Sequence, residues 1–206
     1  SFRPTPVNVI GLSCPIPACG TTALLTDNFD DTVPGPSFTK GADTGLTVTE
    51  SSGHVDVTFA ASVAANAYGW YASSATYTAN GLCTAIEVSQ IPSNGGAAYF
   101  KLASGTTEIE FFESSGTLSL RYKNPTLVTQ KTVPMDLAAH RFWRIRQQGG
   151  TTYWDTSPDG INYLEQVSTA NVFTPTTGTI TFGAGTFTSV VNGGNARFES
   201  VNAKGP

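Results

Sequence analysis

The sequence has little charge, and positive charge is the scarcer sign. Only 13% of its 206 residues are charged, and 11 Lys and Arg residues stand against 15 Asp and Glu residues, for a net charge of −4. This balance argues against a basic face for nucleic acid, so we expect no nucleic-acid partner. No apolar run approaches the roughly 18 residues that a membrane span requires, so we expect no membrane insertion.

A recognisable signal peptide is also missing, and the chain begins at Ser1. This favours one of two origins: a phage particle protein made in the host cytoplasm, or a secreted chain trimmed at Ser1. We therefore expect a virion location or an extracellular, cell-surface location.

Cysteine is scarce: the chain has Cys14, Cys19 and Cys83. A zinc site normally needs four close ligands, and the two histidines lack ligand spacing to the cysteines, so we expect no zinc. Cys14 and Cys19, in "CPIPAC", either close a small disulfide loop or remain free thiols. Cys83 lies in a strand-like run, which is typical of a small core residue.

The first 26 residues differ in composition from the rest. Four prolines fall within the first 17 positions, which favours extended backbone, yet apolar residues are interspersed among them. We interpret residues 1–26 as an extended arm that packs on its own domain or on a neighbouring copy, and residues 27–206 as one domain. The arm predicts a homo-oligomer or protein partners in a larger assembly.

Short strands with period-2 alternation recur after the arm. In "HVDVTFA", Val55, Val57 and Phe59 alternate with polar residues. Similar runs, separated by turns rich in Gly, Ser, Asn and Asp, predict an all-β fold: an antiparallel jelly-roll β-sandwich. The one helix candidate, residues 135–142, is long enough for a single turn.

The hairpin "TTYWDTSPDGINY" places Tyr153, Trp154 and Tyr163 around Asp159-Gly160, a dipeptide that favours a tight turn. The aromatics either staple the hairpin into the core or form a platform for a sugar ring. Together with the preceding "AHRFWRIRQQGG", the segment resembles the late hairpin of the concanavalin A-like lectin/glucanase superfamily, including laminin-G-like jelly rolls. "TDNFDD" at 26–31 resembles the first strand of that superfamily, and "ARFESVNA" at 196–203 the last, which implies that these two segments pair.

Three glutamates in "TEIEFFE" are the strongest catalytic candidates. On a strand with one bulge, Glu108, Glu110 and Glu113 would face one groove, where two carboxylates make a retaining glycosidase pair. The run is similar to the Glu-Ile-Asp-x-x-Glu strand of laminarinase-type glucanases. That resemblance implies Glu108 as nucleophile and Glu113 as acid/base, with Glu110 where the family has Asp. The alternative is a strand with a solvated acidic face.

Two binding sites are also conceivable. Asp27, Asp30 and Asp31 form an oxygen-rich loop that could hold Ca²⁺, or a turn with aspartate caps. Carbohydrate could stack on the aromatic residues Trp70, Tyr71 and Trp154.

These observations favour a chain that is not an enzyme. We expect a non-catalytic structural or adhesive module of an exterior assembly: a phage decoration, capsid or tail component, or a bacterial surface protein, with a glycan as a further ligand. The alternatives are a lectin-like carbohydrate-binding module and, third, a retaining β-glucanase. Apart from Ca²⁺ we expect no cofactor.

Overall fold

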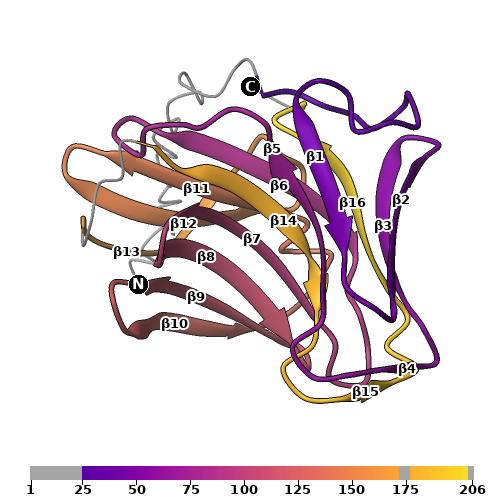
Figure 1. The fold of residues 1–206 in the computed structure, drawn as a ribbon. Helices are drawn as coiled ribbons and strands as arrows, with labels where there is room; N and C mark the ends of the chain where they lie inside the picture. Colours follow the sequence, from indigo (N-terminus) through magenta and orange to yellow (C-terminus); the bar gives the residue numbers. More distant parts are fainter. Residues whose placement is uncertain (1–24, 172–176, 204–206) are drawn as a thin grey trace, which may run out of the picture.

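The structure, a computed structural model, describes residues 25–171 and 177–203, which form sixteen strands. Most strands lie in two seven-stranded antiparallel sheets, and β4 and β15 form a small third one. The expected all-β jelly-roll sandwich is therefore confirmed. Figure 1 shows the strands β7 to β10 side by side in one layer, with β11 and β6 in the other.

The first sheet has the order β1-β5-β14-β7-β8-β9-β10. Its strands are β1 (Phe38–Ala42), β5 (Tyr68–Ser73), β14 (Thr179–Gly185), β7 (Ala97–Ser104), β8 (Thr107–Ser114), β9 (Thr117–Lys123) and β10 (Leu127–Pro134).

The second sheet has the order β13-β12-β11-β6-β16-β3-β2. Its strands are β13 (Leu164–Ala170), β12 (Thr151–Ser157), β11 (Phe142–Gln148), β6 (Cys83–Gln90), β16 (Asn195–Val201), β3 (His54–Phe59) and β2 (Leu46–Ser51). The small sheet pairs β4 (Ser62–Val63) with β15 (Val190–Val191).

The core lies between the two large sheets and is formed by alternate residues of each strand. On β3, Val55, Val57 and Phe59 are buried as the alternation predicts. Across the sandwich, the Phe111 ring of β8 stacks on Trp143 of β11, with ring centroids 5.7 Å apart. Burial of one such large side chain stabilises the fold by about 2–3 kcal/mol, so these contacts hold the sheets face to face.

The chain's first described residues pair with its last strand. The Asp27 N–H donates to the Val201 carbonyl over 3.0 Å, and the Val201 N–H donates back over 2.9 Å. The predicted pairing of these two segments is confirmed, although it is a single bridge and not a full strand. The predicted arm lies outside the described residues except for its last two, of which Leu25 is buried in the core.

In the hairpin of β12 and β13, the three clustered aromatic residues pack within the protein. Trp154 is fully buried between the sheets, whereas Tyr153 and Tyr163 pack on the opposite face over the guanidinium groups of Arg146 and Arg144. The aromatics therefore staple the hairpin, and the platform interpretation is wrong for Trp154.

Residues 135–142 contain one hydrogen-bonded turn, in which the His140 N–H donates to the Asp136 carbonyl over 2.7 Å. The single turn expected there is thus confirmed. Within the described ranges, no helix is long and apolar enough to cross a membrane.

Candidate functional site

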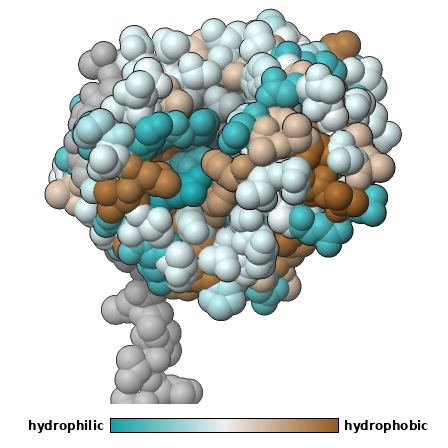
Figure 2. Space-filling model, turned by 60° about the horizontal axis from the view of Figure 1, so that its bottom comes forward, coloured by the Kyte–Doolittle hydropathy of each residue, from teal (hydrophilic) through white to brown (hydrophobic). Residues whose placement is uncertain are grey.

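The face of the first sheet that points away from the core carries a groove of about 350 Å³. Strand alternation builds its floor: on β8, Glu108, Glu110 and Phe112 face the groove, whereas Ile109 and Phe111 are fully buried in the core. In Figure 2 a hydrophilic hollow lies between hydrophobic patches on one face of the molecule.

Charged residues from three neighbouring strands lie in cross-strand rows on this floor. Lys101 of β7 is the register partner of Glu110, and Glu110 is the partner of Arg121 on β9. In the next row, Glu108 is the partner of Lys123. Because the pairing is regular, cation and carboxylate alternate across the groove.

Glu110 is the more deeply placed carboxylate, with 6% of its surface exposed. Its Oε2 accepts a hydrogen bond from Arg121 Nε at 2.6 Å. Burial raises the pKa of Glu110, and the opposing charges of Arg121 and Lys101 only partly offset this. Behind the strand, Trp154 Nε1 donates to the Glu110 carbonyl oxygen over 3.0 Å, which fixes this backbone position from the core side.

Glu108 is less enclosed and pairs with a different cation. Lys101 Nζ donates to Glu108 Oε2 over 3.0 Å, and the same ammonium lies 5.6 Å from the centre of the Tyr99 ring. Since Lys101 stands opposite Glu110 in the register, this bond joins the Glu108 row to the Glu110 row.

Aromatic side chains form one wall of the groove. The Arg121 guanidinium carbon lies 3.6 Å from the centre of the Phe112 ring, and Phe112 meets Phe187 edge to face at 5.2 Å. Phe187 is 50% exposed, and Leu127 at another part of the lining is 54% exposed. Apolar walls around a few polar groups are typical of ligand sites, and ring faces suit sugars.

Glu113 does not belong to this groove, contrary to expectation. The strand β8 pairs with both neighbours without a register shift, so the expected bulge is absent from it. Glu113 therefore points to the core face, where it is fully buried and accepts the Gly116 N–H at 2.9 Å. Phe112 faces the groove where a third carboxylate was expected.

The three aromatics expected to bind sugar lie on different faces. Tyr71 is fully buried and donates its hydroxyl proton to Glu50 over 2.8 Å, and Trp154 is fully buried as well. Neither can stack on a glycan, so the prediction is wrong for both. Trp70 is half-buried on the groove side of β5, where its ring lies across Gly41 of β1.

The acidic loop does not gather its carboxylates into a metal site. Asp27 accepts the Phe29 N–H and Asp31 accepts the Val33 N–H, as capping residues of turns do. Asp30 accepts from the Asn28 side chain. Among the described residues, no group of three or more His, Cys, Asp or Glu could hold a metal ion, so of the two alternatives for Asp27, Asp30 and Asp31 the contacts support the capped turn and give the Ca²⁺ site no support.

The cysteines also depart from expectation. Cys83 is buried, as predicted, but it is disulfide-bonded. Cys14 and Cys19 lie outside the described residues. Three cysteines cannot make both the Cys83 bond and a Cys14–Cys19 bond within one chain, so the disulfide alternative for Cys14 and Cys19 is excluded wherever Cys83 is bonded to one of them.

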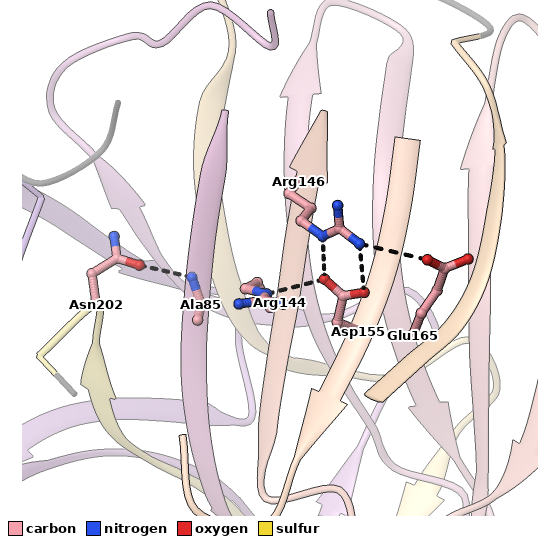
Figure 3. Close-up of polar contacts among 6 residues, drawn as sticks. All are labelled: Ala85, Arg144, Arg146, Asp155, Glu165 and Asn202. Atoms are coloured by element: carbon pink, nitrogen blue, oxygen red, sulfur yellow. Dashed lines mark hydrogen bonds and ion pairs between the residues drawn. The ribbon is translucent and has the colours of Figure 1, made fainter. Parts of the chain in front are cut away.

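A second polar cluster lies on the other side of the molecule, on the outer face of the second sheet. Arg144 and Arg146 both donate to the fully buried Asp155, at 3.0 and 2.7 Å, and Arg146 also approaches Glu165 at 3.6 Å. Figure 3 shows the two guanidinium groups turned toward Asp155. Two cations on one carboxylate, covered by tyrosines, bind the hairpin to the sheet.

Sequence reasoning missed most of the groove. It found Glu108 and Glu110 but overlooked Lys101, Arg121 and Lys123, because a cation's place beside a carboxylate depends on the pairing of separate strands. Strict alternation along β8 would have placed Phe112 in the groove in place of Glu113.

Comparison with known proteins identifies the fold and no family. No family model matches the chain, and no curated protein matches it. Among solved structures, the Bacillus licheniformis β-glucanase matches with a TM-score of 0.59 and 13% identity over 85% of this chain and 95% of that one. A prokaryotic β-1,3-1,4-glucanase (lichenase) from a mouse hindgut metagenome matches with a TM-score of 0.61 and 11% identity, over 85% and 96%. A GH16 protein from Bacteroides ovatus, solved with a product, gives 0.56 and 10%, over 89% and 100%.

These matches confirm the concanavalin A-like jelly roll and correct the expected function. Proteins titled as glucanases share this fold over 85–89% of the chain, which overturns the expectation of a non-catalytic structural module and of a chain that is not an enzyme. None of the three neighbours named is a virion protein, and they give the phage interpretation no support.

Proposed function

We propose that the chain is a glycoside hydrolase that holds a β-linked polysaccharide in the groove and cleaves it at Glu108 and Glu110. The observation that carries the proposal is the pair of carboxylates on adjacent same-face positions of β8, on the floor of a groove with an aromatic wall. The likeness to proteins named as β-glucanases supports it.

Glu110 is the proposed acid/base. Its burial raises the pKa of its carboxyl, which keeps a proton available for a leaving group at higher pH than an exposed glutamate could. The Trp154 bond to its backbone holds the residue in place while the substrate binds.

Glu108 is the proposed nucleophile. Two same-face residues of a strand are separated by about 6.6–6.8 Å along the chain. A retaining pair has its carboxyl groups roughly 5–5.5 Å apart, and Lys101, which stands opposite Glu110, holds the Glu108 carboxylate by a hydrogen bond.

The reaction then proceeds in two displacements. A Glu108 oxygen attacks the anomeric carbon while Glu110 gives its proton to the departing glycosidic oxygen, which leaves with the bonding electron pair. Glu110 next takes a proton from water, whose oxygen attacks the same carbon and releases Glu108. One water is consumed for each bond cleaved, and both carboxyls return to their starting states.

The test is release of reducing ends from lichenan, laminarin and other β-linked polysaccharides between pH 4 and 8. Glu108→Gln and Glu110→Gln should each lower the rate by about 10²–10⁴-fold, with folding checked by circular dichroism. Glu113→Gln is the matched control, since Glu113 lies on the core face of the same strand, and it should keep the activity.

Two results would overturn the proposal. One is the absence of any released reducing end across the panel. The other is hydrolysis that Glu108→Gln and Glu110→Gln leave intact.

A further inference from the structure

We infer that the groove takes a glycan that carries carboxylate or sulfate groups, and that Lys123 binds such a group. The inference rests on the proposed function in one respect, that the groove holds a glycan. It names the substrate class, which the shared fold leaves open.

The charges of the groove do not cancel. Its lining includes three cations, Lys101, Arg121 and Lys123, against the two carboxylates of Glu108 and Glu110. The whole chain carries a net charge of −4, so this local excess of one positive charge runs against the charge of the molecule.

The two carboxylates already have partners. Lys101 pairs with Glu108 at 3.0 Å, and Arg121 pairs with Glu110 at 2.6 Å. In the described part of the chain, Lys123 takes part in no ion pair within 4 Å, although it is the register partner of Glu108. The excess charge of the groove is therefore carried by Lys123.

The position of Lys123 suits contact with a bound sugar. It is half-buried at the end of β9, with Glu108 on one side and the exposed Leu127 on the other in the register. Apolar walls lower the local dielectric constant and strengthen the pull of an ammonium on an anion. A ring bound beside Glu108 would thus bring a carboxylate or sulfate substituent within reach of Lys123 Nζ, where a charge-assisted hydrogen bond forms.

A neutral glucan offers this lysine only hydroxyl acceptors, whereas an acidic glycan offers an anion and gains a charge-assisted contact. Hydrogen bonds to charged groups contribute about tenfold to a hundredfold in affinity. The preference should weaken as salt is raised, since the contact is electrostatic and partly exposed.

The experiment measures binding of the full chain by titration calorimetry to three probes: a neutral β-glucan oligosaccharide, an oligo-uronate and a sulfated oligosaccharide. Lys123→Gln should lower affinity for the acidic probes about tenfold or more and leave the neutral probe unchanged. Lys123→Arg should retain the acidic preference.

Lys131→Gln is the matched control for charge. Lys131 donates to the Gln166 carbonyl on β13 and so points to the other side of β10, and its loss changes the net charge by the same amount. It should leave all three affinities unchanged.

The outcomes separate the inference from the proposed function. If the wild type binds and cleaves the neutral glucan but binds neither acidic probe more tightly, the inference fails and the proposed function stands. If no glycan is bound or cleaved, both fail. Equal losses in Lys123→Gln and Lys131→Gln would also overturn the inference, and the acidic probe with the higher affinity identifies the group.

Discussion

Glu113 should make the protein less stable as pH rises. Its side chain is fully buried, one carboxylate oxygen accepts the Gly116 N–H, and no cation offsets its charge within the described residues. Burial raises the pKa of Glu113 from 4.5 to about 7. Between these two values the unfolded chain releases this proton and the folded chain retains it, so rising pH favours unfolding.

The size of the effect follows from the pKa difference. A difference of about 2.5 pH units corresponds to about 3 kcal/mol of stability, which is fully present below pH 4.5 and is lost as the pH rises to 7 and above. Glu113→Gln keeps an acceptor oxygen for Gly116 and carries no charge. Its free energy of unfolding should therefore fall about 2.5 kcal/mol less than that of the wild type between pH 5 and pH 8.

Urea unfolding at several pH values between 4 and 8.5 measures this difference, with thermal melting as a second probe. The melting temperatures of the two proteins should separate by about 5–10 °C between pH 5 and pH 8. Glu199→Gln on β16 controls for the loss of one negative charge. Parallel stability curves for the wild type and Glu113→Gln would refute the assignment of Glu113 as a neutral buried acid.

Three further outcomes are expected. Asp155→Asn leaves two buried guanidinium groups without their shared carboxylate. Scanning calorimetry should therefore show that the free energy of unfolding falls by about 3–5 kcal/mol, and a fall below about 1 kcal/mol would contradict this. Gly41→Ala adds a methyl group that overlaps the Trp70 ring, so tryptophan emission should shift while stability changes by less than about 2 kcal/mol; an unchanged spectrum counts against that ring position. Thiol titration of the unfolded, unreduced chain should find one free thiol per molecule, because Cys83 is disulfide-bonded and the chain has three cysteines; three free thiols would disprove the bond.

The sequence predicted the fold better than the site. Alternation on β3 assigned Val55 and Val57 to the core because a strand's side chains change face at every residue. The same rule applied to β8 would have excluded Glu113, but an assumed bulge moved it to the wrong face. A bulge depends on how the neighbouring strands pair, and the residues of one strand do not reveal that.

The partners of the two groove glutamates could not be predicted for a related reason. Lys101 and Arg121 lie on the strands either side of β8, and their meeting with the carboxylates depends on the register of three strands. Trp154 was ambiguous because its strand carries an aromatic residue on each face, and only packing against the other sheet decides which one enters the core.

The hydrogen bond from Trp154 to the Glu110 carbonyl links the two sides of the sandwich mechanically. Its neighbour Asp155 pairs with Arg144 and Arg146 on the outer face of the second sheet, so the residue that holds the hairpin and the residue that reaches the groove floor are adjacent in the chain. Under the proposed function, substitutions in this hairpin should change turnover without altering any residue that lines the groove. A search for variants with higher proposed turnover or higher heat tolerance therefore has a second place to begin, on the face of the molecule opposite the groove.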